Sequence, residues 1–442
     1  MINLFEHYDS KTAILYQTLE LAGQNHFTTV INDNGFLPDT MTSPYQFFAN
    51  YQVTEGSKPQ FFNDIKVPRF WEIEGNNEQA WIKDKGKIRG NIYYKPHYKA
   101  RIVSHVEWLS EQGKVRFIDH YTKHGVKYAQ TTLDKDETPI LKKYMNQKGQ
   151  EVIYENYKTK NIVLDWEGKT YLFDTQANFI LFYLKVIHAD LSKILINSLA
   201  TSFAVIYFLK EPSESIVFWQ EHIQNEIPEN MKLIFEENVN RHTQLVIPEK
   251  DEYEAVMNRL NLSEQKYVSQ AGYVYDFKKE NQYGHNALIM TNSDQIANLE
   301  LLIRENDTIH FHIGALTEMS SALMDLGKYD NVNLYPSVEQ TTIQSLYTQC
   351  DLYLDINEGN EIEDAVKKAF DYNLLILAYS DTLHNAFVTA VAHRFEKAEQ
   401  ASQLSSFIQS IYADKAQFKQ ALAHQHTHAN EIDISTLTGI LD

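Results

Sequence analysis

Three short loops in the last third of the chain occupy the position that ligand-binding loops take in α/β proteins. Each follows an apolar run that predicts a buried strand, and the loops cover residues 290–295, 314–319 and 355–361. Ligands bind beyond the carboxyl ends of parallel strands, and a diphosphate there requires Lys or Arg, glycine-rich backbone or helix N-termini. The candidate residues for such a site are Ser293, Asp294, Thr317, Glu318, Asn357, Glu358 and Gly359.

The charge of these loops argues against a diphosphate site. No Lys or Arg lies between residues 280 and 303 or between residues 309 and 327, and the third loop continues with Glu363 and Asp364 before any Lys. A carboxylate about 4 Å from a phosphate charge costs ~1 kcal/mol in water and about 4 kcal/mol at an effective dielectric of 20. We therefore expect a degenerate site. Two alternatives stay open: the acidic residues cap helices, and helix-end amides hold a phosphate.

Other arrangements that could support catalysis or metal binding are weak. His424, His426 and His428 alternate, so they do not share one face of a helix, and we expect a solvated helix end. Cys350 precedes a predicted buried strand and has the character of a core residue. The sequence has no G-x-S-x-G, P-loop or G-x-G-x-x-G motif. We expect no catalytic residue, no bound metal and no cofactor.

The elements that must position these loops alternate between strand and helix, which is typical of a parallel sheet covered on both faces. Two such regions predict two Rossmann-like domains, residues 1–60 with 176–285, and residues 286–442. In the second, the expected strands are 288–290, 309–313, 332–335, 352–354 and 374–378, and the expected helices are 294–304, 320–326, 337–349 and 362–370. In the first, we expect strands at 2–5, 27–31, 204–209, 215–219 and 244–247, and helices at 11–21 and 190–202.

Residues 61–175 have a different pattern, in which glycine-containing turns separate short segments of β-forming residues. The turns end at Gly113, Gly125, Gly149 and Gly168. Glycine supplies the positive φ that short hairpin loops need. The segment therefore predicts an antiparallel, largely one-layer sheet inserted into the first domain.

Composition restricts the partners and the compartment. The chain has 442 residues and a formal net charge of −19, so non-specific binding to nucleic acid or anionic lipid is not expected. One cysteine excludes an internal disulfide and agrees with the reducing cytoplasm. We find no signal peptide and no apolar stretch of about 20 residues that could span a bilayer. Without a visible basic amphipathic helix, any membrane association is peripheral at most.

Several distinctive segments occur in a recognisable order. They are residues 34–39 (NGFLPD), 67–73 (VPRFWEI) leading to 75–77 (GNN), 293–296 (SDQI), 314–320 (GALTEMS), 351–357 (DLYLDIN), 373–378 (NLLILA) and 382–384 (TLH). Across essentially the whole chain, these segments resemble the accessory Sec system glycosylation chaperone family, the stabilising subunit of a UDP-GlcNAc:peptide N-acetylglucosaminyltransferase.

The resemblance implies a GT-B-like fold with a β-sheet insertion in the first domain. It also implies a complex with a homologous catalytic subunit that transfers GlcNAc to Ser and Thr of serine-rich repeat adhesins. In this family the stabilising subunit binds the unfolded acceptor polypeptide. Catalytic relatives carry a strand-end basic pair and an E-x7-E pattern, whereas here Val366 stands eight residues after Glu358. This departure agrees with the degenerate donor site.

Recognition of acceptor or partner is expected to involve the inserted sheet and the cleft between the two domains. The candidate residues are Arg69, Trp71, Glu72, Asn76, Asn77, Trp108 and Tyr121, and Tyr93, Tyr94 and Tyr128 add further aromatic surface for docking a partner. Ordinary sheet packing and a capped turn are the structural alternatives for these residues. Two other functions stay open: a self-sufficient GT-B glycosyltransferase that uses a UDP-sugar, and a general peptide chaperone.

Overall fold

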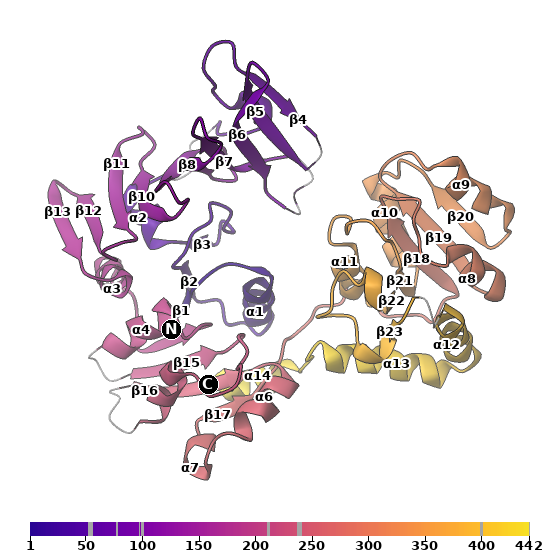
Figure 1. Ribbon diagram of the computed structural model, residues 1–442. Helices are drawn as coiled ribbons and strands as arrows, with labels where there is room; N and C mark the ends of the chain where they lie inside the picture. Colours follow the sequence, from indigo (N-terminus) through magenta and orange to yellow (C-terminus); the bar gives the residue numbers. More distant parts are fainter. Residues whose placement is uncertain are drawn as a thin grey trace. The chain divides into compact units, whose positions relative to one another are not determined.

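The computed structural model in Figure 1 describes residues 1–51, 56–76, 78–96, 98, 101–209, 213–236, 241–397 and 401–441. The chain forms two compact units, Met1–Ala271 with Leu437–Asp442, and Gly272–Thr436. The division therefore falls before residue 285, the end expected from the sequence. Tyr273 explains the shift, because its backbone N–H donates to the Asn430 carbonyl (2.8 Å) and its carbonyl accepts from the Ile432 N–H (2.9 Å). The strand-like segment after Ala271 is thus tied to the second unit.

The second unit contains a six-stranded parallel sheet with the strand order β20-β19-β18-β21-β22-β23. This is the 3-2-1-4-5-6 order of doubly wound folds. Helices α8, α12 and α13 contribute apolar side chains to the core on one face of the sheet, and α10 and α11 to the core on the other. Figure 1 shows these helices around the sheet. The elements are β18 (Asn286–Thr291), α8 (Leu299–Glu305), β19 (His310–Ala315), α9 (Ser321–Met324), η3 (Asp325–Lys328), β20 (Val332–Tyr335), α10 (Gln340–Gln349), β21 (Leu352–Asp355), α11 (Ala365–Asp371), β22 (Leu375–Tyr379), η4 (Ser380–Thr382), η5 (Val391–His393), β23 (Arg394–Phe395), α12 (Ala401–Ala413) and α13 (Lys415–His428).

The first unit has a parallel sheet of the same winding, β17-β16-β15-β14-β1-β2-β3. Its elements are β1 (Ile2–Phe5), α1 (Ser10–Leu21), β2 (Phe27–Val30), β3 (Met41–Thr42), α2 (Pro44–Ala49), α3 (Gln176–Val186), β14 (Lys193–Ile196), α4 (Thr201–Phe208), β15 (Ser213–Phe218), α5 (Glu229–Lys232), η2 (Leu233–Phe235), β16 (Arg241–Ile247), α6 (Lys250–Met257), α7 (Leu262–Gln265), β17 (Val268–Gln270) and the C-terminal α14 (Ile434–Leu441). Two Rossmann-like sheets and the inserted sheet together make the predicted GT-B-like architecture.

The insertion is an antiparallel meander of ten strands, as the glycine spacing predicts. A short 3-10 turn, η1 (Phe62–Asp64), precedes it. The strands are β4 (Glu72–Gly75), β5 (Gln79–Asp84), β6 (Lys87–Tyr94), β7 (Val103–Leu109), β8 (Val115–Tyr121), β9 (Lys127–Leu133), β10 (Pro139–Met145), β11 (Glu151–Asn156), β12 (Ile162–Trp166) and β13 (Lys169–Phe173). The later strands are not a free single layer, because Tyr45 of α2 stacks on Tyr144 of β10 (4.3 Å) and both belong to the core of the first unit.

The expected helix at 190–202 and strand at 204–209 are wrong, because the order is reversed. Strand β14 pairs with β1 in the centre of the sheet, with Ile194 opposite Ile2, and the helix α4 follows it. A central strand is buried on both faces and has no alternation, so its apolar run cannot be distinguished locally from a buried helix.

Three expected helices in the second unit begin later than the sequence suggests, and α10 is one of them, since it starts at Gln340 rather than residue 337. The other two follow β18 and β21: α8 starts at Leu299 rather than residue 294, and α11 starts at Ala365 rather than residue 362. Asp364 stands at the N-terminal boundary of α11, but its side chain makes no capping hydrogen bond. The residues left out of α8 and α11 form the loops at the carboxyl ends of β18 and β21.

The loop after β2 packs against the turn between β8 and β9, and Gly35 is the point of contact. Its φ is +81°, and a Cβ there would lie 2.6 Å from the Tyr121 carbonyl oxygen and 2.9 Å from the Tyr128 ring. The Lys123 N–H donates to the Gly35 carbonyl (2.8 Å). This contact joins the inserted sheet to the Rossmann sheet of the first unit.

We expect Gly35→Ala to destabilise the first unit by about 2–4 kcal/mol, because positive φ and steric overlap both disfavour a Cβ. Gly149→Ala is the matched control: its φ is +74° but no atom lies within 4 Å of the added Cβ. The control should lose only about 1 kcal/mol. Urea unfolding of the two variants measures the difference, and equal losses would contradict a packing role for Gly35.

Candidate functional site

The strand-end loops of the second unit meet at the point where the winding direction of its sheet reverses, between β18 and β21. This is where α/β proteins of this topology bind ligands. Here the two loops are hydrogen-bonded to each other: the Ala297 N–H donates to the Ile356 carbonyl (3.0 Å) and the Glu358 N–H to the Gln295 carbonyl (3.0 Å). These two backbone N–H groups are therefore not free to bind a phosphate.

Asn357 holds the same junction through its side chain. Its buried carboxamide oxygen accepts from the Thr291 hydroxyl (2.9 Å), and its amide donates to the Gly359 carbonyl (3.2 Å). A Cβ on Gly359 would lie 2.2 Å from the side-chain oxygen of Asn292, so a larger residue at position 359 requires the Asn292 side chain to move. The predicted residues Asn357 and Gly359 thus stabilise the loop junction.

The structure corrects one part of the charge argument, because a lysine does reach the third loop. Lys397, which follows β23, forms an ion pair with Glu358. The pair joins residues 39 positions apart, so inspection of each loop by itself could not find it. The lysine is neutralised by the predicted residue Glu358.

A second cation at this edge is His384, which follows β22. Its Nδ1 lies 2.5 Å from the buried Asp355 carboxylate, and its Nε2 lies 2.8 Å from the Gly359 carbonyl oxygen. The hydrogen bond to Asp355 raises the pKa of His384 to about 9, against the opposing effect of burial. The imidazolium therefore donates both N–H groups inside the protein, and neither is available to a ligand.

The four other predicted loop residues, Ser293, Asp294, Thr317 and Glu318, do come together. They line a cavity of about 350 Å3 next to the junction. Within the part of the chain that the structure describes, no Lys or Arg lines this cavity. The arrangement has the shape of a ligand site but lacks the cations that a diphosphate requires.

The candidate recognition residues of the inserted sheet do not form one polar cluster. Trp71, Trp108 and Tyr121 are half-buried against a small apolar core. The Trp108 indole also donates to Asp119 (2.9 Å). Tyr128 is 1% exposed, so it cannot present a docking surface.

The polar candidates lie at the start of the same sheet. Asn76 forms the β4–β5 turn, where its side-chain oxygen accepts from the N–H groups of Glu78 (2.8 Å) and Gln79 (2.9 Å). Arg69 and Glu72 are exposed, and the Arg69 guanidinium lies 4.8 Å from the Phe70 ring centroid. Asn77 lies outside the described residues. These contacts of Asn76 are those of a turn-forming residue.

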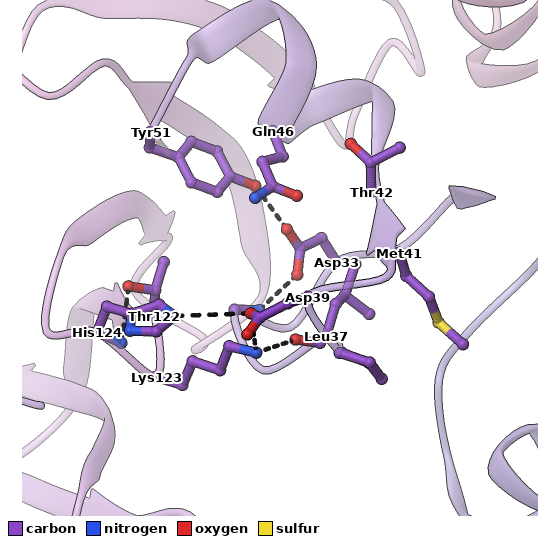
Figure 2. A pocket seen from close by; sticks show the side chains of 12 residues that line it. Asp33, Leu37, Asp39, Met41, Thr42, Gln46, Tyr51, Thr122, Lys123 and His124 are labelled. Atoms are coloured by element: carbon purple, nitrogen blue, oxygen red, sulfur yellow. Dashed lines mark hydrogen bonds and ion pairs between the residues drawn. The ribbon is translucent and has the colours of Figure 1, made fainter. Parts of the chain in front are cut away.

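Sequence reasoning missed a cavity of about 370 Å3 in the first unit, which Figure 2 shows. Its centre is Asp33, whose buried carboxylate accepts from the Tyr51 hydroxyl (2.7 Å), the Ser43 hydroxyl (3.2 Å) and the Gly35 N–H (2.6 Å). Two further lining residues, Lys123 and Asp39, form an ion pair (2.6 Å). The segment 34–39, which the sequence marks as distinctive without assigning it a role, supplies part of the lining of this cavity.

We expect the imidazole of His384 to titrate near pH 9, measured by NMR with His384→Gln to assign its signal. In Asp355→Asn the midpoint should fall by about 2 units or more, because the neutral amide no longer favours the charged ring. The raised pKa stabilises the folded protein below about pH 6.5, by ~2–3 kcal/mol, and this stability is lost as the pH rises through about 9. A wild-type midpoint below pH 7 would contradict the contact.

Comparison with known proteins finds relatives that match nearly the whole chain. Models of the GtfB N-terminal, middle and third domains match residues 2–48, 71–174 and 176–259, and a GftB/GlyA-F C-terminal domain model matches residues 287–425. In solved structures, a chain of the crystal structure of the GtfA/B complex bound to UDP and GlcNAc superposes with a TM-score of 0.91 at 38% identity, covering 100% of this chain and 99% of that one. A chain of accessory secretory protein 1, 2 and 3 from Streptococcus pneumoniae (TM-score 0.60, 11% identity) shares the fold.

Two curated relatives carry the same name, UDP-N-acetylglucosamine–peptide N-acetylglucosaminyltransferase stabilizing protein GtfB. The Streptococcus agalactiae protein is 41% identical over 87% of both chains, and the Streptococcus pneumoniae protein is 39% identical over 98% of this chain and 97% of its own length. On the strength of this identity over nearly its full length, the chain belongs to the GtfB family of stabilising proteins.

Proposed function

We propose that this chain is the non-catalytic, acceptor-binding and stabilising subunit of an O-GlcNAc transferase complex. The complex would glycosylate Ser and Thr of serine-rich repeat adhesins in the cytoplasm before export by the accessory Sec system. No helix in the described part of the chain combines the length and apolarity that crossing a bilayer requires. We propose at most a peripheral contact with the membrane.

The main support for this proposal is that the loops after β18 and β21 are hydrogen-bonded to each other. A donor diphosphate would have to displace the Glu358 N–H to Gln295 hydrogen bond and compete with Glu358 for Lys397. Leaving such polar groups unpaired costs about 1–3 kcal/mol each. Keeping the hydrogen bonds and the ion pair within the protein is therefore more favourable than binding a diphosphate at these loops. We propose that the sugar donor binds to a catalytic partner instead.

The acceptor function is supported by the first unit, whose cavities are lined by both hydrogen-bond donors and acceptors. An unfolded Ser/Thr-rich polypeptide offers little apolar area, so its recognition depends on hydrogen bonds and on repeated weak contacts. The cavity of Figure 2 combines the carboxylates of Asp33 and Asp39 with Lys123, His124 and Gln46. Such a mixture of donors and acceptors suits backbone amides and hydroxyls.

The inserted sheet is the proposed docking element for a homologous catalytic subunit. Phe117 of β8 and Ile88 of β6 are 43% and 40% exposed. Phe117 is paired across the strands with Trp108, which fits the expectation that Trp108 contributes to an aromatic surface. Exposed aromatic and aliphatic side chains next to half-buried ones are typical of protein interfaces.

Isothermal titration of UDP-GlcNAc into the isolated chain tests the donor-site proposal. We expect no binding up to about 1 mM, since the loops provide no free cation for the diphosphate. The complex with its catalytic partner should bind the donor and transfer GlcNAc to a Ser-rich peptide. Micromolar binding, or transfer by the isolated chain, would instead establish a self-sufficient glycosyltransferase.

Co-purification with the catalytic partner tests the docking element. We expect Phe117→Glu to weaken the complex by at least about tenfold, because a carboxylate in an apolar interface loses its hydration without a partner. Leu262→Glu on α7 is the matched control, since Leu262 is 87% exposed on another element. If both variants co-purify as well as the wild type, the partner docks elsewhere.

A further inference from the structure

A second cavity of the first unit, of about 380 Å3, lies between the loop after β2 and the inserted sheet. Its wall includes Asn32 from that loop, Lys142 from β10, Glu155 and Asn156 from β11, the adjoining Tyr157, and Gln176 at the start of α3. The volume accommodates roughly a dozen waters. The cavity therefore has room for a small polar group of a ligand.

Lys142 is the unusual member of this wall. Its ammonium lies 4.8 Å from the Tyr144 ring centroid and 5.9 Å from that of Tyr128, and within the described residues it has neither a hydrogen bond nor an ion pair. Burial lowers the pKa of Lys142, although Glu155 and Asp33 act in the opposite direction. The half-buried ammonium has three N–H donors, and leaving them without oxygen acceptors is costly.

The other groups that face the cavity differ in how far they are already engaged. The Gln176 side chain is satisfied by Asn32 (3.2 Å), the Tyr45 hydroxyl (3.0 Å) and Thr201 (3.0 Å). Glu155 accepts a long hydrogen bond from the Tyr144 hydroxyl (3.3 Å) and interacts with Tyr45, which leaves lone pairs on its carboxylate, and burial raises its pKa. The Tyr157 hydroxyl has no hydrogen-bond partner among the described residues. An ammonium, a carboxyl and a phenol are thus free to bind a ligand.

These three groups select a neutral ligand that both donates and accepts hydrogen bonds. A phosphate would meet Lys142 and Lys160 but also the carboxylates of Glu155 and Asp33, which repel it, so two cations and two anions give it no excess of positive charge. An apolar group would leave the ammonium unsatisfied. A hydroxyl fits, because its oxygen accepts from Lys142 while its proton is donated to Glu155.

We propose that this cavity binds hydroxyl-bearing groups of the acceptor polypeptide, either Ser/Thr side chains or the sugar already attached to them. The assignment rests on the acceptor-binding function proposed above. Asp33 lines both this cavity and the cavity of Figure 2, so a bound polypeptide can contact both along the loop after β2. Lys142, Glu155 and Tyr157 are then the residues that recognise hydroxyls.

Fluorescence anisotropy with the full chain tests the site with three labelled peptides. One is Ser/Thr-rich, the second is the same peptide carrying O-linked GlcNAc, and the third has Ala in place of every Ser and Thr. We expect Lys142→Met to weaken binding of a hydroxyl-bearing peptide roughly tenfold, the loss of one charge-assisted hydrogen bond. Tyr157→Phe, which removes a single oxygen, should act in the same direction.

Lys143→Met is the matched control, because this neighbour on β10 points to the other face and pairs with Glu151 (2.9 Å). It should bind all peptides like the wild type, and circular dichroism melts check that each variant is folded. If the variants lose affinity only for the glycosylated peptide, the cavity binds the sugar. If they also lose affinity for the unmodified peptide, the cavity binds Ser/Thr side chains.

Unchanged binding by both Lys142→Met and Tyr157→Phe, or an equal loss with the Ala peptide, overturns this assignment and leaves the acceptor function intact. If the wild type binds none of the peptides, alone or with its catalytic partner, the acceptor function itself fails.

Discussion

A parallel sheet leaves its strand-end loops with backbone groups that must be satisfied where the winding direction reverses. Active nucleotide-binding proteins satisfy part of this requirement with the ligand. In the second unit of this chain, the loops after β18 and β21 satisfy one another, with Asn357 and His384 completing the network. The rest of the unit is then an intact Rossmann-like fold that needs no ligand to be complete.

The first unit meets the same constraint in a similar way. At the end of β1, the buried carboxylate of Glu6 accepts from the Ser202 N–H at the start of α4 (2.8 Å) and from the Asn32 amide (3.1 Å). The helix N-terminus, which could attract an external anion, already has an anion from the chain itself. Both Rossmann-like sheets therefore retain the fold of nucleotide-binding proteins while using internal groups at the ligand position.

Two polar cavities lie at the junction of the first Rossmann sheet with the inserted sheet. Stacking of Tyr45 on Tyr144 and the tight approach at Gly35 hold the two sheets together there. Asp33 lies between the two cavities and is tied to Tyr51, Ser43 and Gly35, so the loop after β2 has a defined position. In the proposed function, a polar wall held in this way would lower the entropic cost of binding the unfolded polypeptide.

The parallel and antiparallel regions, the hairpin spacing of the insertion, and the absence of cations within each strand-end loop could be predicted from the amino-acid sequence, because these are properties of short segments. The order of β14 and α4 could not, since a central strand and a buried helix have similar apolar runs. Three further features also became visible only in the folded chain: Lys397 reaches Glu358, a hydrogen bond to Asp355 raises the pKa of His384, and the Lys142 ammonium lies over the Tyr144 ring. These depend on contacts between distant segments, and the electrostatic energy of a side chain follows from its surroundings in space, which local spacing does not encode.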